Sequence, residues 1–580
     1  MLIEAGSDPE SYNYQVPCFH TLSTEEKEMA WNFFVHHYDS DEKRDPKYRE
    51  EHDGVLYPRA GTLGGCTAHN AMITVVPHDS DWDDIAHRTN DESWHADNMW
   101  KYWQRVERCL YQKAPPPGQP DPAGHGFNGW LGTSKVDPSI ALGDRGVMGT
   151  IVAALSRAAR RFWYRGFFHR ILHFLTTGDD PNDLRNRAAY EGVTTTIPLA
   201  TVKGKRNGTR EFIRSVQEKY PDRLIVKMSN LATRVIMDDD KRALGVECWE
   251  GKDLYKAGPN ATEKPKYEKK EYRCAREVIL AGGAFNTPQL LMLSGIGPKT
   301  HLEDPKIGIK CLVDLPGVGS NLQDRYEVGV VSKMKRPFSM LEGVTFKPPG
   351  PDTPPDPAFK EWQRGKGLYT SNGAMAAMIL KSDSGKPDPD LFIFALPGDF
   401  RGYFPGYSEL ITTRKNSLTW AIIKAHTNNT AGTVRLRSSN PLETPEVDFH
   451  YFEEGNDTSG DDLESVVKGV KFVRRMNAGN RKIACEVLPG PQVHDEDLGK
   501  WIRDNAWGHH ASCSCKIGRV DDPKAVVDSR FRVIGTKGLR IVDASVFPRI
   551  PGFFIVTPIY MISEKAADVI VEDAQRSAAG

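Results

Sequence analysis

Residues 283–298, GAFNTPQLLMLSGIGP, limit the possible folds of this chain most strongly, because they follow the hydrophobic run VILAG at 278–282. This arrangement is typical of a buried strand that passes through a glycine turn into a helix, the crossover that cradles a nucleotide. Gly283 lets the backbone approach a phosphate or a ribose, and Thr287 and Pro288 are predicted to open the helix. The first amides of that helix favour an anionic group, so the segment predicts a nucleotide-binding domain.

Three other segments accompany it: RAGTLGGCTAHNAMI at 59–73, GHHASCSCKIG at 508–518 and LRIVDASVFPRIPG at 539–552. In this order, the four segments resemble the glucose-methanol-choline (GMC) family of FAD-dependent oxidoreductases. The resemblance extends from the first residues to about Val571. It implies FAD as cofactor and hydride transfer from a small substrate, a formate-like acid or an alcohol, to the flavin N5. The alternatives are a hydroxynitrile lyase of the same fold and a truncated, inactive flavin fold.

Composition limits the partners of the protein. The 76 basic and 77 acidic residues give a formal net charge of −1, so neither nucleic acid nor an anionic membrane is an expected partner. No apolar run reaches the ~18 residues of a membrane span, and the N-terminus shows no export signal, so a soluble protein is expected. Nine scattered cysteines do not predict a disulfide framework. A small-molecule substrate is expected, with O2 or a quinone as electron acceptor.

A chain of 580 residues is too long for one ordinary core, so two domains are expected. The predicted class is α/β, or α+β overall. We assign a discontinuous dinucleotide-binding FAD domain to residues 1–80, 205–330 and 525–575. A substrate domain with a mainly antiparallel sheet and helices is assigned to residues 81–204 and 331–524.

Alternating and apolar runs predict the strands. LIVKMSNLATRVIMD at 224–238 alternates apolar and polar residues and, with the following ALGVECWE, predicts antiparallel strands. Residues 390–450 contain LFIFALP, LTWAIIKA and GTVRLR, consistent with a sheet that floors a substrate pocket. Residues 151–176, rich in arginine and aromatics, predict a helix packed over the substrate domain, with a membrane-surface role as the alternative.

The first residues, MLIEAG, are typical of the end of a buried strand followed by an acidic residue. Glu4 stands where a dinucleotide fold places its ribose-binding carboxylate, with a GxGxxG phosphate loop about 20 residues earlier. GVGSNL at 317–322 lacks the third glycine, so the loop is not found elsewhere. The chain is therefore expected to be shortened at its N-terminus, with weakened binding of the pyrophosphate.

The resemblance also implies cofactor contacts, residue by residue. Gly64 and Gly65 permit close backbone approach, and a turn at Asp543 meets the cofactor as well. The helix opened by Thr557 and Pro558 points its positive end toward the flavin N1 and C2 carbonyl. The expected cofactor-binding residues are Glu4, Arg59, Gly64, Gly65, Cys66, His69, Asn70, Ala71, Ala232, Gly283, Asp543, Ala544 and Val556.

The role of His69 has two interpretations. In family members similar to choline oxidase and pyranose dehydrogenase, a histidine at this position bonds covalently to the C8 methyl carbon of the flavin. The other reading is a buried, hydrogen-bonded histidine without such a bond. Enzymes that resemble formate oxidase instead carry a formyl group at C8, which excludes a histidyl bond at the same carbon.

The segment 508–518 places His510 at the catalytic histidine of the family pattern HPVGTxxMG. An imidazole near the flavin suits removal of a hydroxyl proton as the hydride leaves carbon. His509 is expected to point away. A zinc site formed by His509, His510, Cys513 and Cys515 is the alternative, although no second ligand pair accompanies it, so no metal is expected.

The second catalytic position, eleven residues after Asp543, is normally His or Asn but is Phe554 here. Arg549 is the candidate replacement, because a guanidinium can bind a carboxylate through two parallel hydrogen bonds. Formate oxidases of the family resemble this pairing of His with Arg. The alternative is a solvated or ion-paired surface arginine.

Overall fold

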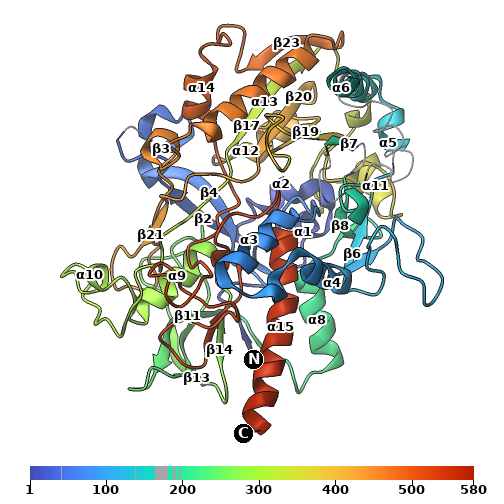
Figure 1. The fold of residues 1–580 in the computed structure, drawn as a ribbon. Coiled ribbons are helices and arrows are strands. Elements are labelled where there is room, and N and C mark those ends of the chain that lie inside the picture. Colours follow the sequence, from blue (N-terminus) through green and yellow to red (C-terminus); the bar gives the residue numbers. More distant parts are fainter. Residues whose placement is uncertain (41, 138, 164–179, 187–190, 195–196, 580) are drawn as a thin grey trace.

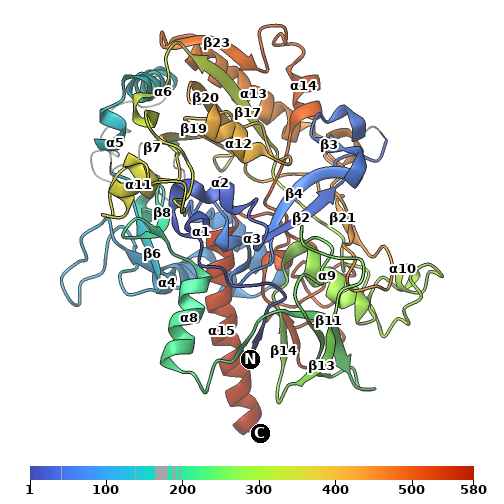
Figure 2. The same ribbon diagram turned by 180° about the vertical axis from the view of Figure 1, so that it is seen from behind.

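A six-stranded antiparallel sheet organises one half of the molecule (Figures 1 and 2). Its strands, in spatial order, are β23 (Ile483–Leu488), β17 (Glu327–Met334), β20 (Ser417–Lys424), β19 (Leu391–Leu396), β18 (Ala376–Leu380) and β7 (Gly192–Thr194). Every residue of β20 is buried, as expected for a central strand covered on both faces. Helix α13 (Asp461–Asn477) packs on β17, β19 and β20. The expected strands at 391–396 and 417–424 are thus confirmed within an antiparallel sheet, whereas GTVRLR forms β21 (Thr433–Arg435), which pairs with β22 (Glu446–Asp448).

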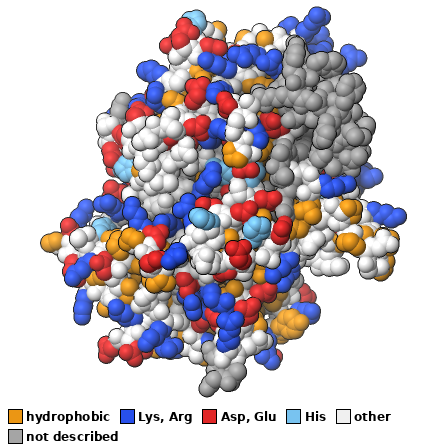
Figure 3. Space-filling view, in the orientation of Figure 1, with side chains coloured by type: hydrophobic (Ala, Val, Ile, Leu, Met, Phe, Trp, Pro, Cys, Tyr) orange, Lys and Arg blue, Asp and Glu red, His pale blue; other side chains and the backbone are white. Residues whose placement is uncertain are grey.

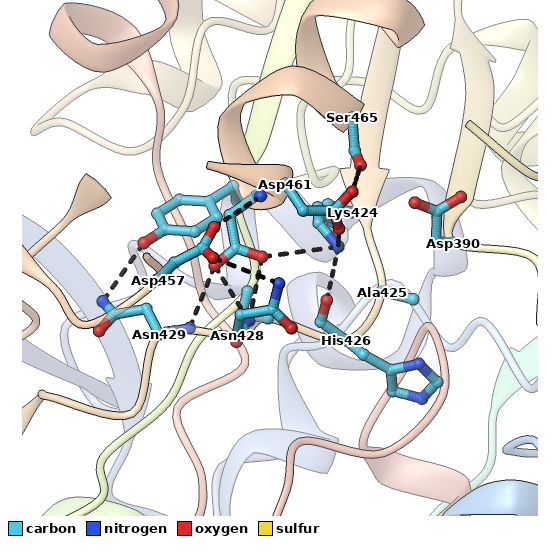
Figure 4. Close-up of polar contacts among 12 residues, drawn as sticks. Asp390, Lys424, Ala425, His426, Asn428, Asn429, Asp457, Asp461 and Ser465 are labelled. Carbon is cyan, nitrogen blue, oxygen red and sulfur yellow. Dashed lines mark hydrogen bonds and ion pairs between the residues drawn. The ribbon is translucent and has the colours of Figure 1, made fainter. Parts of the chain in front are cut away.

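The N-terminus of α13 is fixed to the end of β20 through a buried lysine (Figure 4). Lys424 Nζ lies 3.5 Å from Asp461 and 3.6 Å from Asp462, and donates to the carbonyl of His426 at 2.7 Å. The Asp462 carboxylate accepts the backbone amide of Asn428 at 3.0 Å. These contacts fix the turn after β20, which carries the His426 ring.

Parallel strand pairs place the segments that the sequence singled out. β1 (Leu2–Ile3) pairs with β10 (Val226–Lys227), and β14 (Val278–Leu280) pairs with β24 (Leu539–Ile541). Parallel strands present their carboxyl ends at the same edge, where ligands of α/β folds bind. This arrangement brings Glu4, Gly283 and Asp543, far apart in sequence, to the ends of their strands. The mixture of helices and sheets confirms the predicted fold class.

The remaining elements build smaller sheets and cover these layers. An antiparallel sheet joins β11 (Asn230–Met237), β12 (Ala243–Glu250) and β13 (Glu268–Arg273), which confirms the antiparallel strands expected in 224–250 from Asn230 onward. The start of that segment differs, because Val226–Lys227 pairs in parallel with β1. The other strands are β2 (Ala30–Val35), β3 (Tyr48–Arg49), β4 (Gly54–Ala60), β5 (Glu107–Cys109), β6 (Leu131–Ser134), β8 (Leu199–Val202), β9 (Lys205–Arg206), β15 (Ile296–Gly297) and β16 (Val313–Asp314). The other helices are α1 (Tyr12–Gln15), α2 (His20–Ser23), α3 (Asp79–Thr89), α4 (Ala96–Val106), α5 (Ser139–Leu142), α6 (Arg145–Trp163), α8 (Thr209–Lys219), α9 (Gly283–Leu293), α10 (Lys299–Leu302), α11 (Pro357–Trp362), α12 (Tyr407–Thr413), α14 (Leu498–Asn505) and α15 (Val556–Ala579).

Two helix starts differ from the prediction. Helix α9 begins at Gly283, so Thr287 and Pro288 lie inside it. The reason is that the Asp543 carboxylate accepts the Gly283 amide at 2.9 Å and the Thr287 hydroxyl at 2.6 Å, which supplies a cap from another segment. Helix α15 begins at Val556, which places Thr557 within the first turn rather than at the cap.

This computed structural model describes residues 1–580 except 41, 138, 164–179, 187–190, 195–196 and 580. The helix predicted at 151–176 is described only to Trp163, where α6 ends, and its last part lies outside the described residues. In the described part of the chain, no helix has both the length and the apolar character that a membrane crossing requires. On the face shown in Figure 3, the described Lys and Arg side chains alternate with Asp and Glu.

Candidate active site

A cavity of about 820 Å³ connects the segments that the sequence singled out. Its lining includes thirteen of the fifteen predicted site residues: Glu4, Arg59, Gly64, Gly65, Cys66, His69, Asn70, Ala71, Gly283, His510, Asp543, Ala544 and Val556. Ala232 and Arg549 are not among the described residues that line it. The structure therefore brings the four motif segments to one elongated site. Ala232 lies on β11, beside it in the fold but not on its wall.

Two glycines leave their backbone open toward space. Gly65 has φ +55° and Gly283 has φ +81°, and a Cβ atom added at either would meet no described atom within 4 Å. Both residues line the cavity, so their peptide groups can approach a bound group closely. An open backbone is what the sequence analysis expected where the cofactor approaches closely, and the residues present fit FAD.

Glu4 supplies a carboxylate at the other end of the cavity. Its Oε1 accepts the Gly6 amide at 2.8 Å, and its backbone pairs with Lys227 and Asn230. Burial raises the pKa of Glu4 to about 7, although the Gly6 and Ala5 amides oppose the shift. A ligand hydroxyl donating to this carboxylate would stabilise its ionised form.

The loop after β4 holds a thiol and an imidazole against the cavity. Burial alone would raise the pKa of the Cys66 thiol, but the Arg59 guanidinium, 3.7 Å away, and the His69 ring lower that pKa to about 6. His69 is 5% exposed, and its Nδ1 has no hydrogen-bond partner among the described residues. Arg206, which the sequence analysis missed, holds the loop by donating to the Asn70 side chain at 2.8 Å.

His510 is positioned by a buried carboxylate. The Asp324 Oδ1 accepts the His510 amide at 2.8 Å, and Asp324 Oδ2 accepts the Tyr57 hydroxyl at 2.5 Å. That hydroxyl accepts the Ala511 amide at 2.7 Å. Burial, followed by the charges of His509 and Arg325, lowers the pKa of His510 well below its usual value. The ring is therefore neutral near pH 7, which leaves a lone pair on one ring nitrogen, while its lowered pKa makes it a weak base.

Glu327 is a functional candidate that the sequence analysis missed. It is the first residue of β17, is 1% exposed and lines the cavity. Neither of its carboxylate oxygens has a hydrogen-bond partner among the described residues, and Oε2 lies 3.2 Å from His509 Nδ1. An acidic residue that opens the apolar strand EVGVV was the available signal. A buried carboxylate without donors favours a cation beside it.

Aromatic side chains surround this part of the cavity. Phe400, Tyr403, Tyr407 and Phe554 all line it. The Tyr403 ring packs edge-on to His509 at 5.3 Å, and the Phe554 ring packs edge-on to His510 at 5.8 Å. Aromatic faces attract cations and apolar groups.

Arg549 acts on two residues outside the cavity lining. Burial and then the His426 charge lower the pKa of His78, and the His426 charge and hydrogen bond lower the pKa of Asp81 against the effect of its burial. The Arg549 charge lowers both pKa values further. Cys513 and Cys515 belong to the hydrophobic core, whereas His509 and His510 line the cavity, so the alternative zinc set is divided between two environments.

Comparisons with known proteins show the family of the chain. Residues 50–327 and 428–563 match the N-terminal and C-terminal models of "GMC oxidoreductase". The chain is 28% identical over 521 residues to an oxygen-dependent choline dehydrogenase of Brucella anthropi, covering 89% of this chain and 82% of that protein.

Solved structures share the fold. A variant of the formate oxidase of Aspergillus oryzae, studied for FAD modification, superposes with a TM-score of 0.76 at 21% identity, covering 99% of this chain and 94% of that one. The pyridoxine 4-oxidase of "Mesorbium loti" superposes with a TM-score of 0.70 at 20% identity, covering 98% and 93%.

Proposed function

This chain is an FAD-dependent oxidoreductase of the GMC family, and from that premise we propose that its substrate is a small alcohol carrying a cationic group. The observation that carries the proposal is Glu327, a buried carboxylate on the cavity wall that meets His509 Nδ1 at 3.2 Å and has no hydrogen-bond partner among the described residues. The choline dehydrogenases to which the chain is similar support a substrate of this chemistry.

The residues that would hold FAD line the cavity. Glu4 would accept ribose hydroxyls, Gly65 and Gly283 would admit the cofactor to the backbone, and the first turn of α15 would stabilise negative charge. FAD, when bound, supplies a hydride acceptor. We retain the division into an FAD domain (1–80, 205–330, 525–575) and a substrate domain (81–204, 331–524) as part of the proposal.

His510 is the proposed base. Its neutral imidazole can take the proton of the substrate hydroxyl while the hydride leaves the adjacent carbon. Asp324 and Tyr57 orient it through the backbone amides of His510 and Ala511. Phe554, in place of a polar second residue, excludes water beside the reacting carbon, and the product is an aldehyde.

Glu327 is proposed to select the substrate. A trimethylammonium or protonated amine placed beside its carboxylate would neutralise a charge that is otherwise buried without donors. Tyr403 and Phe400 offer ring faces to the same group. The cation would thus be fixed at one end of the substrate and the hydroxyl at His510.

A small carboxylate such as formate is the second candidate. Two observations favour it: Phe554 removes a polar partner for an alcohol, and the half-buried Arg59 lines the cavity. Arg549, the expected clamp, is not among the described residues that line this space. The fold shared with formate oxidase is consistent with this candidate.

The electron acceptor and the flavin linkage complete the proposal. We assign O2 as acceptor, as the names of the related choline dehydrogenases suggest, with a quinone as the alternative. His69, whose Nδ1 has no hydrogen-bond partner in the described part of the chain, is proposed to bond to the flavin C8 methyl carbon. Acid precipitation tests the bond: yellow colour should stay in the pellet of the wild type and move to the supernatant in His69→Ala.

The proposal is tested by the visible spectrum of the purified protein under anaerobic conditions. We expect a flavin spectrum that is bleached by choline and not by formate. Bleaching by formate alone would establish the acid branch. Cyanide release from a cyanohydrin without bleaching would indicate a lyase, and a colourless protein that binds no added FAD would indicate an inactive flavin fold.

A further inference from the structure

Three side chains with metal-ligating atoms meet behind the loop that carries Phe554. His78 precedes α3, Asp81 lies in its first turn, and His426 follows β20. One ligand atom of each lies within 4.8 Å of the other two. None of the three is among the described residues that line the cavity. We propose that His78, Asp81 and His426 bind a divalent transition-metal ion such as Zn²⁺.

The distances fit such an ion after small adjustments. His426 Nε2 lies 2.8 Å from Asp81 Oδ1, and His78 Nδ1 lies 3.9 Å from Asp81 Oδ2. A tetrahedral zinc with bonds of ~2.0–2.1 Å places its ligand atoms roughly 3.3 Å apart. The ion would therefore replace the hydrogen bond between His426 and one Asp81 oxygen with a longer separation, and would draw His78 toward the carboxylate. The two rings are 5.1 Å apart at 61°, so their nitrogens can converge without stacking.

The ligand types select the class of ion. Two imidazoles and one carboxylate suit zinc and neighbouring transition metals, whereas magnesium and calcium prefer oxygen ligands. Among the described residues, the buried His78 Nδ1 has no hydrogen-bond partner, so this atom is available as a ligand. Three protein ligands leave the fourth position of a tetrahedral ion for water.

The outer contacts orient the three ligands. Asp81 Oδ2 accepts the amides of His78 and Gly552, each at 2.9 Å. The His426 carbonyl accepts the Lys424 ammonium, and the His426 ring extends away from that lysine (Figure 4). Such second contacts fix the orientation of metal ligands.

Arg549 opposes the ion. Its positive charge acts on both His78 and Asp81, while the negative charge of Asp388 acts on His78. Coulomb repulsion between a guanidinium and a divalent ion weakens binding. We therefore expect Arg549→Ala to lower the Kd for zinc.

The ion would join three segments of the fold. Gly552 belongs to the loop between Arg549 and Phe554 and has a φ of +53°. It packs closely on Pro77, because a Cβ atom added at Gly552 would lie 2.8 Å from the Cα atom of Pro77. Occupancy would hold this loop, the start of α3 and the end of β20 together. Phe554, beside His510, lies at the end of the same loop.

Zinc titration by calorimetry tests the proposal on holoenzyme treated with a chelator and dialysed. We expect one Zn²⁺ per chain, with the Kd raised at least ~10²-fold in His426→Ala and in His78→Ala. His494→Ala, at an exposed histidine, is the control and should bind as the wild type does. Thermal melts without zinc show whether each variant folds. Should His426→Ala not fold, the partly exposed His78→Ala carries the test.

Crystals soaked in ZnCl₂ give an independent answer. An anomalous difference peak between the three side chains is expected. The proposal is overturned if the wild type takes up no zinc, if binding survives in His78→Ala and His426→Ala, or if the only peaks lie at surface histidines.

Discussion

His509 Nδ1 lies 3.2 Å from Glu327 Oε2, and neither Glu327 oxygen has a hydrogen-bond partner among the described residues. Because a cationic substrate would neutralise this carboxylate, Glu327→Gln should lower kcat/KM for choline ~10²-fold. The kcat/KM for the neutral isostere 3,3-dimethylbutan-1-ol should change by no more than about twofold, because this substrate has no positive charge to interact with Glu327. Steady-state kinetics with both substrates measures the difference.

Glu268→Gln, at an exposed residue of β13, is the control and should alter neither substrate. Equal decreases in kcat/KM for choline and for its neutral isostere would mean that Glu327 supports the shape of the cavity and does not recognise the charge of the substrate.

His510 and His509 should differ sharply although their rings are 4.0 Å apart. His510→Ala is expected to lower kcat by ~10²-fold or more, because the proton acceptor is lost while the flavin stays bound. His509→Ala should cost much less. Rapid mixing that follows flavin bleaching measures both variants, and the opposite order would assign the base to His509.

Acid should destabilise the fold through two half-buried histidines whose pKa values are lowered. Burial lowers the pKa of His20 to about 4, and the same cause lowers that of His78 to about 4. Their unfolded-state pKa values are near 6.5, so the unfolded chain binds more protons between pH 6.5 and pH 4. Stability present above pH 6.5 is lost as the pH falls through this window.

Melting temperatures across that window measure the effect. His20→Gln removes one titrating group and can still donate to the Asn372 carbonyl, which His20 Nε2 approaches at 3.1 Å. Its melting temperature should therefore fall less steeply than that of the wild type between pH 6.5 and 4. Glu4, with its pKa raised to about 7, acts in the opposite direction and is unchanged in this comparison. Parallel curves would show that His20 contributes nothing to the pH dependence.

The sequence could predict the elements that local patterns specify. The run VILAG predicted β14, the alternation at 224–238 predicted β11, and the motif glycines predicted the cavity wall. Helix starts were less predictable, because α9 takes its cap from Asp543, 260 residues away from Gly283. No local pattern carries a contact of that range.

The directions of the side chains in the site were harder to predict from the sequence than the segments that form its wall. Arg549 was expected in the cavity from its chemistry, but it is not among the described residues that line the cavity. A glutamate at the start of a strand is ordinarily solvated. Glu327 became a strong candidate when the structure showed that both of its carboxylate oxygens are buried and have no hydrogen-bond partner among the described residues. Both outcomes depend on tertiary neighbours.

Gly65 and Gly308 provide a matched test of the flavin cradle. Both have positive φ, +55° and +66°, and an added Cβ meets nothing within 4 Å at either position. Alanine at each should therefore cost a similar ~1–2 kcal/mol of backbone strain. Only Gly65 lines the cavity, so Gly65→Ala should also raise the Kd for FAD at least ~10-fold, equivalent to ~1.4 kcal/mol, by blocking close approach.

Fluorescence titration of the apoprotein with FAD measures the Kd, and chemical denaturation measures the shared strain. If Gly308→Ala weakens FAD binding as much as Gly65→Ala does, the loss comes from general destabilisation, and the cradle at Gly65 does not contact the cofactor.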